Sequence, residues 1–175
     1  LEAFHKSYAR MGIDLLPEAM LITHGGSDAL MFTLATICNP GDEVLVPEPY
    51  YSNYDSFLKS ADAHLVPIET SLENHYHLPS KEEIVKLINP KTKAIMFSNP
   101  GNPTGIVYTF KEMNMLVEIA NEHDLWIITD EVYRQFIYDK NVEYKSFMNI
   151  PEVKNRTILI DSISNITVRV VRELV

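Results

Sequence analysis

The stretch that decides the fold is Lys93-Ala-Ile-Met-Phe-Ser-Asn-Pro-Gly-Asn-Pro-Thr-Gly105. Its apolar first half predicts a buried strand, and the prolines that follow end this strand because they lack a backbone donor and fix φ. Gly101 and Gly105 permit unusual backbone, so they predict a rigidly shaped loop, although an ordinary connection to a helix remains an alternative. Ligands bind at the carboxyl ends of strands in open α/β sheets, where the Asn102 amide can both donate and accept hydrogen bonds.

Strand and helix patterns alternate on both sides of this stretch. This alternation predicts an α/β fold in three layers, with a mainly parallel central sheet covered by helices on both faces. We expect one domain of this kind, with further strands at 21–23, 44–46, 64–68, 125–129 and 157–160 and helices at 25–37, 50–61, 80–89 and 109–123.

Composition narrows the class of function. The chain has 175 residues and a net charge of −9, which argues against binding nucleic acid and favours a small-molecule ligand. No apolar run approaches the roughly 18 residues of a membrane helix, and no signal peptide is recognisable. The single cysteine, Cys38, cannot form an internal disulfide, so we expect a cytoplasmic protein. Because the chain starts at Leu1 within a helical pattern, we expect it to be part of a longer protein.

Glycine-rich and aromatic segments follow the first two expected strands. Gly25-Gly26-Ser27 begins a helix, where unpaired backbone N–H groups and the helix dipole suit a phosphate. A glycine-rich helix entry without a ligand explains the same residues. Tyr51 offers a ring on which a flat ligand can stack, whereas packing in the core is the favoured interpretation for Tyr50 and Tyr54.

Acidic and hydroxyl side chains follow the last two strands. Asp130 ends a strand expected to be buried, so its carboxylate should lie at the sheet edge, where a cationic partner can hold it ionised; Tyr133 follows it closely. An acid/base pair of Asp130 with Glu131 is disfavoured because neighbouring extended residues point to opposite faces. Ser162 and Ser164 share one face of the segment after the last strand, where they offer hydroxyls or form only a serine-rich turn.

Two other kinds of site are disfavoured. His75 and His77 alternate in a polar loop and supply at most half of a tetrahedral metal shell, so we do not expect metal binding. A nucleophile pair of Cys38 with His24 lacks support because Cys38 lies on the apolar side of its helix and is expected in the core.

Three motifs together resemble the large domain of class I and II aminotransferases, fold-type I enzymes that use pyridoxal 5′-phosphate. They are Asn99-Pro-Gly-Asn-Pro-Thr-Gly105, Thr129-Asp-Glu-Val-Tyr-Arg134 and Asp161-Ser-Ile-Ser164, and they occur in the family's order. Bacterial aspartate-aminotransferase-like members are the most similar. The resemblance implies a partial cofactor-binding domain at 1–165 and a tail of uncertain relation at 166–175. It also implies a homodimer that transfers an amino group from an amino acid to a 2-oxo acid.

The resemblance implies roles on the phosphate side of the cofactor. Gly25, Gly26 and Ser27 match the segment whose backbone holds the phosphate. Ser162 and Ser164 match hydroxyl groups on the same side.

It implies further roles around the pyridine ring. Tyr51 matches the aromatic residue that stacks on the ring, and Tyr133 matches the tyrosine that hydrogen-bonds the ring oxygen. Asn102 matches the asparagine near the ring hydroxyl and the substrate carboxylate. Asp130 matches the acid that pairs with the pyridinium nitrogen and keeps the ring protonated.

The sequence departs from the family pattern at Asn165. Family members carry the Schiff-base lysine directly after Ser-x-Ser, and asparagine has no amine with which to bind the cofactor or carry a proton. The tail 166–175 does not resemble the family's glycine-containing stretch with its phosphate-binding arginine. We therefore expect a truncated or spliced aminotransferase whose final residues do not come from the family sequence. Its parent gene should encode lysine at the position of Asn165. A pyridoxal-phosphate lyase on the same scaffold and a non-catalytic domain that retains the fold are the alternatives.

Overall fold

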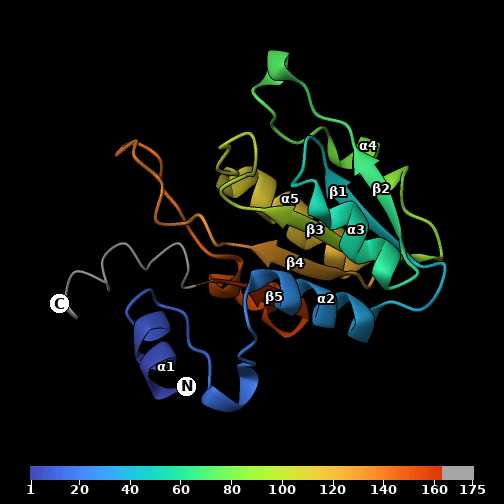
Figure 1. Ribbon diagram of the computed structural model, residues 1–175. Helices are drawn as coiled ribbons and strands as arrows, with labels where there is room; N and C mark the ends of the chain where they lie inside the picture. The colour runs from blue at the N-terminus through green and yellow to red at the C-terminus, as the bar shows by residue number, and fades with distance from the viewer. Residues whose placement is uncertain (163–175) are drawn as a thin grey trace.

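The strands assemble into one parallel sheet in the computed structural model, which describes residues 1–162. Within this range five strands lie in the order β2-β1-β3-β4-β5, and every neighbouring pair is parallel (Figure 1). The strands are β1 Glu43–Pro47, β2 His64–Ile68, β3 Thr92–Ser98, β4 Trp126–Asp130 and β5 Thr157–Ile160. This arrangement confirms the α/β fold that the sequence predicts.

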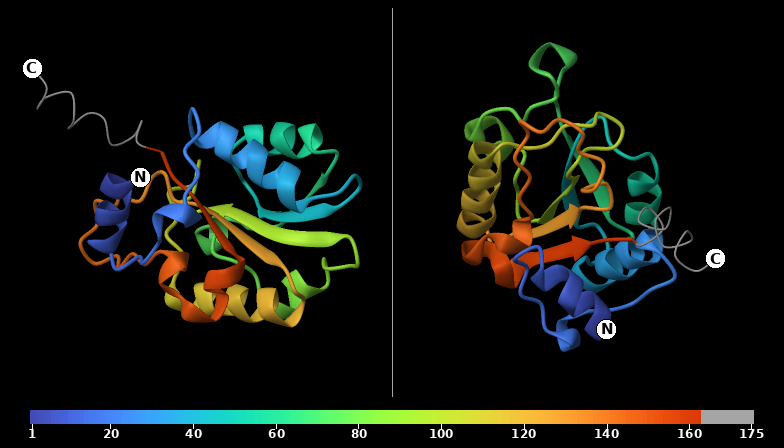
Figure 2. Two further views of the ribbon diagram at one scale, coloured as in Figure 1. Left: turned by 90° about the horizontal axis from the view of Figure 1, so that it is seen from below. Right: turned by 90° about the vertical axis from the view of Figure 1, so that its left-hand side faces the viewer.

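Helices cover both faces of the sheet and give the molecule three layers (Figure 2). Helices α2 and α3 pack on one face, while α4, α5 and the short helices η3 and η4 pack on the other. The α-helices are α1 Glu2–Ala9, α2 Gly26–Ile37, α3 Asn53–Ser60, α4 Lys81–Val85 and α5 Phe110–Glu122; the 3-10 helices are η1 Pro17–Ala19, η2 Leu72–Asn74, η3 Phe147–Asn149 and η4 Pro151–Arg156. None of these helices is long and apolar enough to cross a bilayer.

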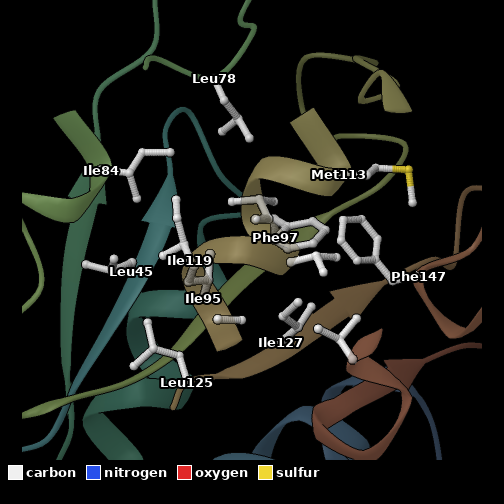
Figure 3. Packing of buried hydrophobic residues seen from close by; sticks show 14 of the residues in the cluster. Leu45, Leu78, Ile84, Ile95, Phe97, Met113, Ile119, Leu125, Ile127 and Phe147 are labelled. Atoms are coloured by element: carbon white, nitrogen blue, oxygen red, sulfur yellow. The ribbon is translucent and has the colours of Figure 1, made fainter. Parts of the chain in front are cut away.

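Strand β3 supplies residues to a separate core on each face. Successive side chains of a strand point to opposite faces, so Ile95 and Phe97 pack beneath α5 while Ala94 and Met96 pack beneath α2 and α3. In the α5 core, the Phe97 ring lies 4.9 Å from the Phe147 ring, measured between centroids (Figure 3). Burial on both faces explains why this strand reads as an unbroken apolar run.

A crevice at one edge of the sheet is lined in part by the ends of β1 and β3 and by the loops that follow them. From β1 the chain crosses to β2 on one side, and it then returns to place β3 on the other side of β1. The loops that leave β1 and β3 therefore diverge, and such a switch point is where open α/β sheets bind ligands. The five described strands are parallel, so the residues that directly follow β4 and β5 lie at the same edge.

Two local predictions are wrong. Residues 21–23 form no strand, because Leu21 and Ile22 are 76% and 61% exposed and pair with no described strand. Helix α3 begins at Asn53 rather than Tyr50, because Tyr50 precedes the helix and packs against the core. Cys38, the C-cap residue of α2, is half-buried and packs against the core under α2 and α3, as the sequence predicts.

Candidate functional site

The loop after β3 is held in one shape by its own backbone. The Gly101 N–H donates to the Ile106 carbonyl over 2.7 Å, and the Gly105 N–H donates to the Gly101 carbonyl over 2.8 Å. A Cβ at Gly101 would lie 2.5 Å from the Thr104 hydroxyl oxygen, and Gly105 has a φ of +73°. Both positions therefore require glycine, as the sequence predicts.

This loop brings Asn102 next to a residue from the β4 loop. The Asn102 Nδ2 donates to the Tyr133 hydroxyl over 3.4 Å, although the two residues lie 31 positions apart in the chain. An amide and a phenol that can each donate and accept thus meet at the carboxyl edge of the sheet.

Asp130 ends β4 as a buried carboxylate with two donors. Its side chain is 6% exposed; its Oδ2 accepts from the Tyr54 hydroxyl over 2.8 Å and its Oδ1 accepts from the Val132 N–H over 3.3 Å. Burial raises the pKa of Asp130, the hydrogen bonds from Tyr54 and Val132 lower it, and the nearby charge of Asp161 raises it. A cationic ligand would lower this pKa and stabilise the carboxylate.

Tyr54 belongs to the site although its spacing indicated a core residue. Its ring is buried as expected, with 1% of its surface exposed, but its hydroxyl reaches Asp130 from α3 across the sheet. The pKa of Tyr54 is raised, first by burial and then by the charge of Asp130, so the hydroxyl keeps its proton and donates. A buried tyrosine hydroxyl needs a partner, and this was the available indication that Tyr54 does more than pack.

Tyr51 lies between β1 and α3 and is oriented by its neighbours. Its ring meets the Tyr54 ring edge-on, with centroids 5.6 Å apart and planes at 88°, and its hydroxyl accepts from the Asn53 Nδ2 over 2.7 Å. Because Tyr51 packs against Tyr54 and Tyr54 bonds to Asp130, the stacking candidate and the acidic candidate are linked through one side chain.

The beginning of α2 approaches the ends of β4 and β5. A Cβ at Gly26 would lie 3.8 Å from the Val132 and Ile160 side chains and 3.9 Å from the Ser162 Cβ. The first amides of a helix have no carbonyl partner within that helix and carry its positive dipole end, so this corner can receive an anion. Gly25 and Ser27 flank Gly26 there, whereas Ser164 and Asn165 lie outside the described residues.

Glu131 points away from Asp130 into a separate buried network. Its carboxylate accepts from the Tyr144 and Ser146 hydroxyls, from the Thr129 hydroxyl and from the Phe147 N–H. The two neighbouring carboxylates therefore do not form a pair. Glu131 instead fixes the segment after β4 against the sheet.

Curated relatives resemble most of this chain but extend well beyond it. The aspartate/prephenate aminotransferase of Thermus thermophilus is 35% identical over 79% of this chain and 36% of its own length. The aspartate aminotransferase of Geobacillus stearothermophilus is 32% identical over 93% of this chain and 42% of its own length. The chain thus spans about two fifths or less of these relatives.

Solved structures share the fold. A mutant of Thermus thermophilus aspartate aminotransferase superposes with a TM-score of 0.85 at 32% identity, covering 93% of this chain and 44% of that one. The aromatic aminotransferase from Pyrococcus horikoshii gives a TM-score of 0.87 at 31% identity over the same shares. The model of the family described as aminotransferase class I and II matches residues 1–165. This chain therefore belongs to the aminotransferase class I and II family.

Proposed function

We propose that this chain is the cofactor-binding part of an aminotransferase of the aspartate aminotransferase kind, which moves an amino group from an amino acid to a 2-oxo acid. The observation that carries the proposal is the buried Asp130 carboxylate with its Tyr54 hydroxyl, in a chain of this family. Members of the family use pyridoxal 5′-phosphate. That cofactor combines a cationic ring nitrogen with a phosphate, and the site has groups suited to both.

Asp130 and its neighbours are suited to hold the ring. When bound, pyridoxal 5′-phosphate withdraws electrons from the substrate carbon that loses a proton. In our proposal, the Asp130 carboxylate keeps a proton on the ring nitrogen, and the Tyr54 hydroxyl keeps that carboxylate charged and in place. Tyr51 would cover one face of the ring, while Asn102 and Tyr133, 3.4 Å apart, would bond to the ring oxygen. Asn102 also contacts the substrate carboxylate.

The start of α2 is suited to hold the phosphate. We assign the phosphate to the backbone of Gly25, Gly26 and Ser27 together with the Ser162 hydroxyl, because the Gly26 and Ser162 positions lie within van der Waals contact. We assign Ser164 to the same end from the family resemblance alone. Backbone amides that are fixed before binding need no rearrangement when the anion arrives.

Asn165 prevents this chain from completing the reaction in the proposed form. The family pattern calls for a lysine amine there, and the asparagine amide neither binds the cofactor covalently nor carries protons at neutral pH. The family match ends at residue 165, so the change in sequence character coincides with this position.

We infer that a single missing nucleotide explains the tail. Codons for Asn begin with AA, and one purine added after those two bases produces a Lys codon in place of Asn165. The codons of the present tail, read in that restored frame, then allow glycine in place of Val171, arginine in place of Glu173 and glycine in place of Val175. Lysine followed by a glycine-containing stretch with an arginine is the pattern that the resemblance calls for.

Sequencing the native gene tests both inferences. We expect AAA or AAG at the codon for residue 165, in frame with downstream sequence that encodes the glycines and the arginine. The protein expressed from that restored gene should bind pyridoxal 5′-phosphate as an imine of the new lysine. Reduction with borohydride should make this bond permanent, and peptide mass mapping should locate the adduct at residue 165. The present chain should show no such adduct. An Asn codon followed by the same tail in native DNA would overturn the frame inference.

A cofactor-binding domain without catalysis is the second candidate, and Asn165 favours it. It predicts that the native gene keeps the Asn codon and that the chain binds the cofactor without a covalent bond. For the aminotransferase, we further propose a cytoplasmic homodimer, in accord with the single cysteine and the family resemblance. Product analysis of the restored protein with amino acids and 2-oxo acids separates amino transfer from the elimination that a lyase would catalyse.

A further inference from the structure

Asp161 precedes Ser162 and places a second, partly buried carboxylate at this edge of the sheet. Its carboxylate accepts from both terminal nitrogens of Arg134, over 2.5 Å to Oδ1 and 2.6 Å to Oδ2. It also accepts from the Tyr8 hydroxyl over 2.6 Å and from the Ser162 N–H over 2.8 Å. Four donors thus converge on one side chain that is 12% exposed.

Both terminal nitrogens of Arg134 are engaged in this cluster, while its Nε is buried without a hydrogen-bond partner among the described residues. Its side chain is 7% exposed, one terminal nitrogen also donates to the Glu131 carbonyl over 3.3 Å, and its guanidinium carbon lies 5.8 Å from the centre of the Tyr8 ring. A planar guanidinium that engages both carboxylate oxygens fixes the orientation of its partner as well as its charge. Because both terminal nitrogens donate to Asp161, Arg134 affects the neighbouring residues by holding the Asp161 side chain in place.

We propose that Arg134 is a positioning residue for phosphate binding, which it serves by neutralising Asp161 and holding it against the Ser162 N–H. This proposal deepens the function proposed above and depends on it. Ser162 lies beside Gly26 at the beginning of α2, where we assign the phosphate. Because the Ser162 N–H donates to Asp161, a shift of the Asp161 side chain would also move Ser162. Without Arg134, an uncompensated carboxylate would stand next to the position assigned to the phosphate and repel it.

The phosphate-specific part of binding provides the test. Calorimetric titration with pyridoxal 5′-phosphate and with pyridoxal, which lacks the phosphate, gives two dissociation constants whose ratio isolates the contribution of the phosphate. Arg134→Gln should weaken binding of the phosphorylated compound about tenfold and leave pyridoxal unchanged. Arg134→Lys, which keeps the charge without the planar fork, should give an intermediate loss and serves if the Gln variant does not fold.

Arg156→Gln is the matched control. Arg156 bonds Asp124 over 2.9 Å near the opposite ends of β4 and β5, so it tests the loss of an arginine–aspartate pair away from the phosphate position. Both dissociation constants should remain unchanged in this variant. An unchanged ratio in Arg134→Gln and Arg134→Lys would overturn the proposal, as would an equal change of the ratio in Arg156→Gln.

Hydrogen exchange tests without any ligand whether Arg134 holds Asp161 against the Ser162 N–H. The Ser162 amide should exchange about tenfold faster in Arg134→Gln than in the unmodified chain, because its acceptor is no longer held. Its exchange rate should not change in Arg156→Gln. Failure of the unmodified chain to bind either compound would count against the proposed function alone. Unchanged Ser162 exchange in the Arg134 variant would count against the positioning role alone.

Discussion

At the scale of single residues, Tyr54 shows how one side chain joins the core to the site. Its ring fills the space between α3 and the sheet, and its hydroxyl supplies the shorter of the two hydrogen bonds to Asp130. Burial raises the pKa of the Asp130 carboxyl, whereas a donor aimed at it lowers the pKa by favouring the charged form. The same tyrosine therefore packs in the core and lowers the pKa of the acid against the effect of burial.

Replacing Tyr54 with phenylalanine should raise the pKa of Asp130 further and make the loss of stability depend on pH. When the pKa of a carboxyl is higher in the folded protein than in the unfolded chain, the protein loses stability as pH rises from the unfolded pKa through the folded pKa. The cost of Tyr54→Phe should therefore be greater at neutral pH, about 1–3 kcal/mol, than below about pH 4. Urea unfolding at both pH values measures the two costs.

Tyr108→Phe is the control for this prediction. Tyr108 is also buried, but its hydroxyl makes no hydrogen bond to another described residue. Its replacement should leave stability nearly unchanged at both pH values. Equal costs of Tyr54→Phe at neutral and acidic pH would show that the hydroxyl does not act on Asp130.

At the scale of elements, α5 is fixed by a cap that also ties down a distant segment. Glu112 accepts from the Thr109 N–H over 2.8 Å and from the Thr109 hydroxyl over 2.7 Å, which completes a capping box. It also accepts from the Leu78 N–H over 2.8 Å and contacts His77 Nδ1 at 3.0 Å. The cap thus joins the start of α5, just after the Asn102 loop, to the segment that follows β2.

Glu112→Gln should destabilise the protein by about 1–3 kcal/mol at neutral pH, because several buried donors lose a charged acceptor. Burial acts to raise the pKa of Glu112, but the hydrogen bonds from Thr109, Leu78 and His77 outweigh it, so the pKa is lowered. A carboxyl with a lowered folded pKa loses its stabilising contribution as pH falls through that pKa. The difference between variant and unmodified chain should therefore shrink in acid, as followed by urea unfolding.

Glu83→Gln provides the comparison, since Glu83 completes the equivalent capping box of α4 at the surface. We expect a much smaller loss there because water can replace the acceptor. A loss at Glu83 as large as that at Glu112 would contradict the role given to the buried contacts of the α5 cap.

At the scale of the whole molecule, the sheet holds two cores apart and carries the site on its edge. Met96 lies in the core under α2 and α3 with no exposed surface, two residues before the end of β3. Met96→Ala should cost about 2–5 kcal/mol in urea unfolding because it leaves a cavity between closely packed layers. Met31→Ala, which removes the same side chain from a position that is 40% exposed on α2, should cost no more than about 0.5 kcal/mol. Similar costs for the two variants would mean that the layers are not closely packed.

The sequence by itself determined the fold class, the loop of Gly101 and Gly105, and the strand-end positions of Asn102 and Asp130. These features are encoded locally, in apolar periodicity and in the backbone preferences of glycine and proline. The wrong prediction of a strand at 21–23 also comes from relying on local pattern, because three apolar residues do not reveal whether a neighbouring strand is there to pair with them.

Only the tertiary structure decided which side chains form hydrogen bonds to Asp130 and Asp161. Tyr54 reaches Asp130 across 76 positions of the chain, and Tyr8 reaches Asp161 across 153. Such contacts depend on strand order and on the tilt of helices across the sheet, which local periodicity does not specify. The strand and loop at 93–105 thus fixed where a site would lie, and the packing of the layers fixed which residues complete it.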